Sequence, residues 1–208
     1  MRVIGLTGSI GMGKSTAAAA LRRLGIPVHD ADAVVHRLLR SDRETIAAVE
    51  AEFPGVTGPG GVDRPALGAK VFNDPAALRR LEALIHPRVR RSEIAFLRRA
   101  RAAHRSIAVL DIPLLFETGG EARCDATRVV AAPRFLQEQR VLARPGMTRE
   151  RLAAIRQRQS SDEEKLRRAD MVIPTGLDRR TALRILKRAL AVVRVSAPPH
   201  RGLRRVLR

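Results

Sequence analysis

Five short apolar runs alternate along the chain with longer stretches in which apolar residues recur every three or four positions. Such runs are typical of strands buried on both faces of a parallel sheet, and the longer period is typical of amphipathic helices. The runs predict strands at residues 3–7, 27–29, 107–112, 126–132 and 171–173. Their alternation with helices predicts an α/β fold: a five-stranded parallel sheet with helices on both faces.

The stretch between the second and third predicted strands shows only helical periodicity and loops. It predicts a helix over 33–53, a Gly/Pro loop over 55–61 and a short helix over 64–72. A further helix starts at Asp74-Pro75, and we expect His86-Pro87 to interrupt it before a last helix runs to about residue 103. We therefore expect a single domain over 1–195, with a helical insertion at about 33–104 and a helical lid at about 140–165. The basic segment 196–208 is expected to be a disordered tail.

The first predicted strand leads into the pattern Gly8-x-x-x-x-Gly13-Lys14-Ser15, and an Ala-rich helix follows at once. This is the phosphate-binding pattern in its required order of strand, glycine loop and helix. Its N–H groups converge on an anion at the positive end of a helix. Lys14 is expected to reach the outer phosphates and Ser15 to ligate Mg²⁺. No Asn-Lys-x-Asp pattern for guanine is present, so the sequence predicts ATP.

Three carboxylates and one histidine are candidates for the chemistry. Asp30 and Asp32 follow the second strand, and we expect their side chains to point the same way. Asp32 is our preferred base for an acceptor hydroxyl, and the alternative is that one of the two caps the next helix. Asp111 ends the third strand, either as an acid that reaches Mg²⁺ through water or as a cap. His86 contacts a substrate phosphate or caps a helix, and the sequence leaves both open.

Several arginines surround the break at Pro145-Gly146. A lid that closes over ATP needs cations to compensate the phosphate charge. The alternative for most of them is a solvated helix face. The candidates are Arg140, Arg144, Arg149 and Arg151.

The formal net charge of +19 has two explanations. A phosphate-rich partner such as nucleic acid is one. The other is codon usage, because almost all the basic residues are arginine, alanine is abundant, and the chain has no Trp or Tyr on which bases could stack. We weight codon usage above nucleic-acid binding. The lone Cys124, the lack of a membrane-length apolar run and the lack of an N-terminal signal pattern predict a cytoplasmic protein without an internal disulfide.

The motifs, taken in order, resemble those of the dephospho-coenzyme A kinase family, and the resemblance covers roughly residues 1–190. The elements that carry it are Leu6-Thr7-Gly8, Gly11-x-Gly13-Lys14-Ser15-Thr16, Asp30-Ala31-Asp32, His86-Pro87, Pro113-Leu114-Leu115-Phe116-Glu117, Gln159 and Ala169-Asp170-x-Val172-Ile173. The chain departs from the family at Pro174-Thr175-Gly176, where the family often has an Asn shortly before a Gly. We therefore assign no adenine contact there.

The resemblance implies transfer of the ATP γ-phosphate to the ribose 3′-hydroxyl of dephospho-coenzyme A. It implies a nucleotide core, a helical coenzyme-binding domain and a lid. Carried over by position, it assigns roles as follows: Gly11, Met12, Gly13, Lys14, Ser15 and Thr16 bind ATP, with Ser15 at Mg²⁺; Asp32 is the base; Asp30, His86, Leu114, Leu115 and Glu117 face the coenzyme side; Arg140 or Arg144 is the lid arginine.

Two other functions remain open from the sequence. One is another small-molecule kinase with the same phosphate loop, such as a nucleoside-monophosphate kinase. The other is an ATP-dependent nucleic-acid-binding protein, which the charge and the basic tail motivate. We expect ATP and dephospho-coenzyme A as small-molecule partners, no membrane, and a monomer or weak homo-oligomer.

Overall fold

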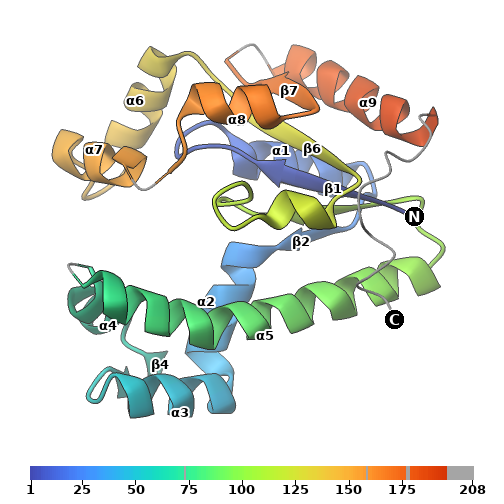
Figure 1. Ribbon diagram of the computed structural model, residues 1–208. Coiled ribbons are helices and arrows are strands. Elements are labelled where there is room, and N and C mark those ends of the chain that lie inside the picture. Colours follow the sequence, from blue (N-terminus) through green and yellow to red (C-terminus); the bar gives the residue numbers. More distant parts are fainter. Residues whose placement is uncertain (73, 158, 177–178, 196–208) are drawn as a thin grey trace. The chain divides into compact units, whose positions relative to one another are not determined.

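A computed structural model describes residues 1–72, 74–157, 159–176 and 179–195 (Figure 1). The tail predicted at 196–208 lies outside the described residues. The described elements, in chain order, are β1 (Arg2–Thr7), α1 (Lys14–Arg23), β2 (Val28–Asp30), α2 (Ala31–Ser41), α3 (Arg43–Glu52), β3 (Thr57–Gly58), β4 (Gly61–Val62), α4 (Arg64–Val71), α5 (Pro75–Ala102), β5 (Ile107–Asp111), the 3-10 helix η1 (Gly120–Arg123), β6 (Ala126–Ala131), α6 (Arg134–Leu142), α7 (Arg149–Gln157), α8 (Asp162–Arg168), β7 (Met171–Pro174) and α9 (Arg179–Val195).

The main sheet has five strands in the order β2-β5-β1-β6-β7, which confirms the predicted five-stranded parallel fold. β1 is central and pairs in parallel with both β5 and β6, and β6 pairs in parallel with β7. In this register Leu6 lies opposite Asp111. The carboxyl ends of β1 and β5 are therefore neighbours, at the edge where open α/β sheets bind ligands.

The chain divides into two compact units. One, the sheet unit, comprises Met1–His29 and the chain from Arg99 onward. The other, the helical unit, is Asp30–Arg98. The boundaries that we predict for the insertion, 33–104, and for the lid, 140–165, stay predictions.

The core of the sheet unit joins α1 and α9 to strands of the sheet. Ile4 and Leu6 of β1 pack with Leu21 of α1 and Leu186 of α9, and all four are almost fully buried. In Figure 1, α1 lies behind β1, whereas α8 and η1 lie in front of it. Helices therefore cover both faces of the sheet, as the apolar strands require.

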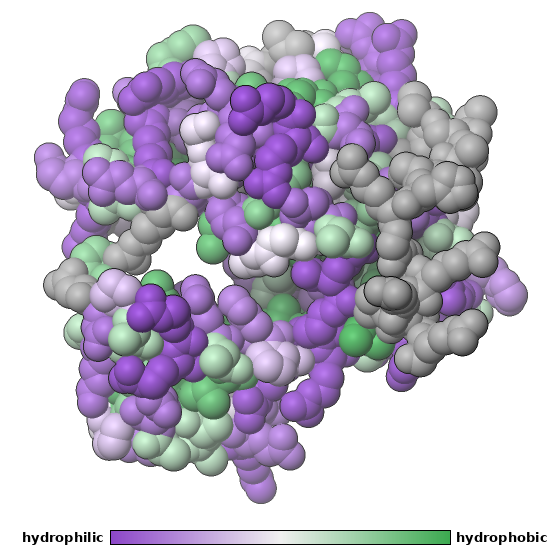
Figure 2. All heavy atoms as spheres, in the orientation of Figure 1, coloured by the Kyte–Doolittle hydropathy of each residue, from purple (hydrophilic) through white to green (hydrophobic). Residues whose placement is uncertain are grey.

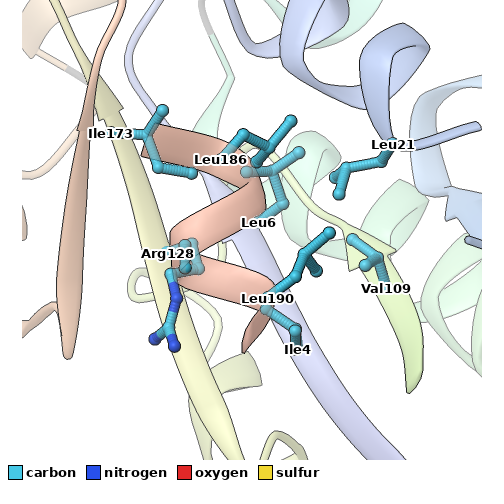
Figure 3. Close-up of a pocket in the computed structure, with 9 residues that line it drawn as sticks. Ile4, Leu6, Leu21, Val109, Arg128, Ile173, Leu186 and Leu190 are labelled. Carbon is cyan, nitrogen blue, oxygen red and sulfur yellow. The ribbon is translucent and has the colours of Figure 1, made fainter. Parts of the chain in front are cut away.

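One charged side chain, Arg128 of β6, borders this apolar core. It lines a small pocket between the sheet and α9, and Figure 3 shows its guanidinium pointing away from Leu6 and Leu186. Arg128 is 5% exposed; its Nη1 donates to the carbonyl of Thr127 at 3.0 Å, and its Nε has no hydrogen-bond partner among the described residues. Burial lowers the pKa of Arg128, and the charge of Asp170 opposes the shift only in part.

Arg128→Met is therefore expected to leave the free energy of unfolding unchanged or to raise it by up to about 2 kcal/mol, since a poorly paired buried charge costs more than it returns. Asp170 keeps its bonds from the N–H and hydroxyl of Thr127, at 2.7 and 2.8 Å. Urea unfolding of the two proteins measures the difference. Arg128→Ala, which also removes the packed stem, is the control and should be less stable than Arg128→Met. A clear loss of stability in Arg128→Met would show that the guanidinium is well compensated.

In the helical unit, the helix predicted at 33–53 is wrong in one respect: it is two helices, α2 and α3, that meet at Asp42. The Asp42 carboxylate accepts hydrogen bonds from the N–H and the hydroxyl of Thr45, so it caps α3. The apolar period continues across the break because both helices face one core, which holds Leu39 and Val49. The Gly/Pro loop predicted at 55–61 contains a short antiparallel hairpin of β3 and β4.

Asp42→Ala is expected to lower the free energy of unfolding by about 1 kcal/mol, the usual cost of losing an N-cap. The hydrogen bond from the Thr45 hydroxyl is the main cause that lowers the pKa of Asp42 below 3.8. The ionised carboxylate therefore stabilises the fold above about pH 4 and loses this effect as the pH falls through the folded-state pKa. The difference between native protein and variant, measured by urea unfolding, should shrink in acid. A difference that stays constant down to pH 3 would contradict this explanation.

The interruption predicted at His86-Pro87 is also wrong, because α5 runs without a break through Pro87. Proline removes one N–H from the helix and crowds the preceding turn. Here the side chain of Arg88 donates from Nη1 to the carbonyl of Leu84 at 2.7 Å. Ile85 is buried before the proline and Val89 packs on the same core after it. Tertiary packing on both sides therefore holds the helix together.

No helix among the described residues is long and apolar enough to span a membrane.

Candidate active site

The loop between β1 and α1 has the conformation that its glycines permit. Gly11 and Gly13 have φ of 76° and 85°, in the left-handed region that other residues avoid. A Cβ at Gly11 would lie 2.5 Å from Cγ2 of Val141, and one at Gly13 would lie 3.2 Å from the side chain of Thr175. Gly13 is also the N-cap of α1 and brings no side chain to it. The first N–H groups of α1 therefore remain available to an anion, which fits a nucleotide phosphate.

Lys14, the first residue of α1, forms an ion pair with Asp111, the last residue of β5. Its Nζ lies 2.8 Å from Oδ1 of Asp111, and the side chains are 15% and 2% exposed. The sequence left Asp111 open between a metal-binding acid and a cap. The structure shows a third role for Asp111: its carboxylate forms an ion pair with the lysine of the phosphate loop. Whether Asp111 also reaches Mg²⁺ stays a prediction.

Ser15 and Thr16 are exposed in the first turn of α1. Within the described part of the chain, no three His, Cys, Asp or Glu side chains gather into a group that would hold a metal ion. Mg²⁺ is commonly bound by one or two protein oxygens together with substrate phosphates and water. The Ser15 hydroxyl beside the phosphate loop fits that type of site.

Arg140 of α6 is tied to the segment that follows β7. Its Nη2 donates to the carbonyl of Thr175 at 2.8 Å. The hydroxyl of Thr175 in turn donates to the carbonyl of Met12 at 2.6 Å. Arg140 is therefore linked to the phosphate loop through a single residue, Thr175. The sequence alone did not predict this link. Of the other candidates, Arg151 contacts the carbonyl of Gly146 with its own guanidinium.

Two residues of this region that the sequence analysis gave no role connect α7 to the phosphate loop. Arg156 of α7 donates to the side chains of Gln137 and Glu138 on α6. Gln137, 1% exposed, donates from Nε2 to the carbonyl of Ile10 at 2.9 Å. In the sequence, the polar Gln137 on the apolar face of the predicted helix was the one signal for this contact. These bonds tie the backbone of the loop to α6 and, through Arg156, to α7.

The predicted substrate contacts in the segment after β5 differ in their exposure to solvent. Leu114 is 36% exposed, whereas Leu115 is fully buried, so close to Gly5 that a Cβ there would lie 2.8 Å from Cδ2 of Leu115. Leu115 belongs to the core, so its side chain is not on the surface where the predicted substrate contact would need it. Glu117 lies 3.0 Å from Nζ of Lys165 and accepts a hydrogen bond from the N–H of Ser160 at 2.9 Å.

The remaining candidates lie in the helical unit. Asp30 accepts a hydrogen bond from the N–H of Ala33 at 3.0 Å, so it is the residue that caps α2. Asp32 is exposed in the first turn of α2. The two side chains therefore do not share one strand face, because β2 ends at Asp30 and helical geometry begins at once. His86 is exposed in the interior of α5, which excludes its alternative role as a helix cap.

Comparison with known proteins identifies the family. The family model described as dephospho-CoA kinase matches residues 2–177. A dephospho-CoA kinase from Paramagnetospirillum magneticum is 62% identical over 95% of this chain and 93% of its own length. One from Rhodospirillum rubrum is 59% identical, over 92% of each chain.

Solved structures agree with the fold. The protein TT1252 from Thermus thermophilus is 41% identical and superposes with a TM-score of 0.81 over 94% of this chain and 98% of its own. A dephospho-CoA kinase from Campylobacter jejuni, 24% identical, has a TM-score of 0.61 over 92% of this chain and 97% of its own, and supports the fold alone. With its phosphate loop intact and a family match across most of its length, this chain belongs to the dephospho-CoA kinase family.

Proposed function

We propose that the chain transfers the γ-phosphoryl group of ATP to the 3′-hydroxyl of dephospho-coenzyme A, the last step of coenzyme A biosynthesis. The observation that carries the proposal is the phosphate loop with its Lys14–Asp111 pair, in a chain of this family. The family also disfavours the two alternatives, a nucleoside-monophosphate kinase and a nucleic-acid-binding protein. The expected cytoplasmic location and the monomeric or weakly associated state stay predictions.

Binding of ATP would use the backbone N–H groups of residues 11–16 and the cation of Lys14. To do so, the Lys14 ammonium would move from Asp111 toward the outer phosphates. The movement would be short, because β1, which leads into the phosphate loop, and β5, which ends at Asp111, end side by side. Arg140 would supply a second positive charge as the lid closes. Bound Mg²⁺, held by Ser15 and the phosphates, would neutralise charge on the β- and γ-phosphates.

The acceptor would be bound by the residues that the resemblance assigns by position. Asp32 would accept the proton of the 3′-hydroxyl as its oxygen attacks the γ-phosphorus, in line with the departing ADP. Asp30, His86, Leu114 and Glu117 would position the coenzyme. These roles follow from the resemblance by position, together with the exposure of Asp32, His86 and Leu114.

The test is a coupled assay of ADP release with Mg-ATP, comparing dephospho-coenzyme A with AMP, CMP, single-stranded DNA and no acceptor. We expect turnover only with dephospho-coenzyme A, and loss of turnover when EDTA removes the metal. Phosphorus NMR of the product should show a new 3′-phosphomonoester. Turnover with AMP or CMP instead, or ATP hydrolysis stimulated by DNA, would overturn the proposal.

A further inference from the structure

A buried lysine in the sheet unit takes part in none of the steps above. Lys165 lies on α8, and its side chain is 1% exposed. Lysine is almost never fully buried unless it is paired. The visible surface of α8 is hydrophilic in Figure 2, and the neighbouring Glu163 and Arg167 are exposed. Lys165 is the one buried residue of this charged helix.

The Lys165 ammonium joins two segments that are far apart in the sequence. Its Nζ lies 3.0 Å from Oε1 of Glu117, after β5, and 3.2 Å from the hydroxyl oxygen of Ser9. Ser9 belongs to the phosphate loop and is 6% exposed. Its hydroxyl donates to Oδ1 of Asp162, also on α8, at 2.6 Å. The phosphate loop is thereby fastened to α8 by two hydrogen bonds through one side chain.

Charge makes this contact strong. Burial raises the pKa of Glu117, but hydrogen bonds from its own N–H, from Lys165 and from Ser160 outweigh burial, so the pKa lies below its ordinary value. The second carboxylate oxygen of Glu117 is buried without a hydrogen-bond partner in the described residues. Compensation of this carboxylate charge therefore depends largely on Lys165.

A phosphate loop binds well only if its N–H groups already point at the phosphates before ATP arrives. The loop between Gly8 and Gly13 contains no helix or strand; one bond within it, from the N–H of Met12 to the carbonyl of Ser9 at 3.1 Å, closes a turn, and contacts from outside hold it further. Gln137 holds the carbonyl of Ile10, and Lys165 with Asp162 holds Ser9. The helix that carries Lys165 begins at Asp162, inside the last residues of the region 140–165 that we expect to form the lid.

We propose that Lys165 is a positioning residue for ATP binding: through Ser9 it holds the phosphate loop in its binding conformation, and through Glu117 it ties the loop to the segment after β5. Lys165 touches no substrate in this role. The proposal rests on the ATP site of the proposed function, and it adds a determinant of ATP affinity that lies outside the phosphate loop.

The test is the Kd for Mg-ATP, measured by calorimetry without acceptor, for Lys165→Met and for the matched surface control Arg167→Met. We expect the Kd of Lys165→Met to rise about tenfold or more, the equivalent of one lost charge-assisted hydrogen bond. Arg167→Met should stay within about twofold of the native Kd. Ser9→Ala should also weaken binding, and the two effects should be less than additive in the double variant, because both changes remove the contact between Lys165 and Ser9.

A purely structural role would lower the melting temperature of Lys165→Met and leave the Kd of the folded protein within about twofold of native, which would overturn the proposal. Fully additive effects of Ser9→Ala and Lys165→Met would overturn it as well. If Lys165→Met does not fold, Ser9→Ala and the charge-retaining Lys165→Arg decide: Ser9→Ala must weaken ATP binding, and Lys165→Arg must bind ATP better than Ser9→Ala.

If the native chain binds ATP but does not phosphorylate dephospho-coenzyme A, only the proposed function fails. If the native chain does not bind ATP, both fail.

Discussion

Lys14→Met is expected to lower kcat/KM by about 10²–10³-fold, the usual effect of removing one group that stabilises the charge of a transition state. Methionine keeps most of the length and the apolar stem of lysine but carries no charge. The phosphates would then lose the cation that lies at the start of α1 and already faces a carboxylate at 2.8 Å. Steady-state kinetics with Mg-ATP and dephospho-coenzyme A measure the loss.

The control has to separate catalysis from stability, because Asp111 is 2% exposed and loses its ion pair in the same variant. The melting temperature of Lys14→Met should therefore fall, and kinetics should be measured well below it. Lys187→Met, on the exposed side of α9, applies the same substitution away from the site and should match native kinetics. If Lys14→Met were folded and retained native kcat/KM, the Lys14 cation would have no role in the chemistry.

The sequence was sufficient for the phosphate loop and for the sheet because both depend on local patterns. The glycine positions of the loop follow from backbone angles that only glycine adopts readily, and Gly11 and Gly13 have these angles. Most of the strands are largely apolar runs, and the observed ends differ from the predicted ones by at most one residue. Nothing beyond the neighbouring residues was needed for either prediction.

What the sequence did not predict depends on contacts between distant residues. Pro87 locally predicts a break, and only the burial of Ile85 and the bond from Arg88 to Leu84 explain why α5 continues. Leu114 and Leu115 are chemically identical neighbours, and only the packing of Leu115 beside Gly5 separates core from surface. Lys165 stands in a run of charged residues that is typical of a solvated helix, and its burial depends on Glu117 and Ser9.

The proposed base, Asp32, can be tested with a substitution that perturbs the structure less than Lys14→Met does. Asp32→Asn replaces one carboxylate oxygen by an amide nitrogen of similar size, in an exposed side chain of the first turn of α2. The structural cost should be small, because a negative charge at a helix N-terminus contributes only about 0.3–1 kcal/mol. An amide cannot accept the proton of the 3′-hydroxyl, so we expect kcat to fall by about 10²–10⁴-fold.

The informative comparison is with Asp30→Asn, the same change two residues earlier. Asparagine is as good an N-cap as aspartate, so α2 should keep its start when Asp30 is replaced. If Asp32 is the base, Asp32→Asn loses kcat with near-native Kd for ATP and near-native melting temperature, whereas Asp30→Asn acts mainly on KM for dephospho-coenzyme A. A folded Asp32→Asn enzyme with near-native kcat would remove Asp32 as the base. A large loss of kcat in Asp30→Asn alone would move that role to Asp30, even though its carboxylate already accepts the N–H of Ala33.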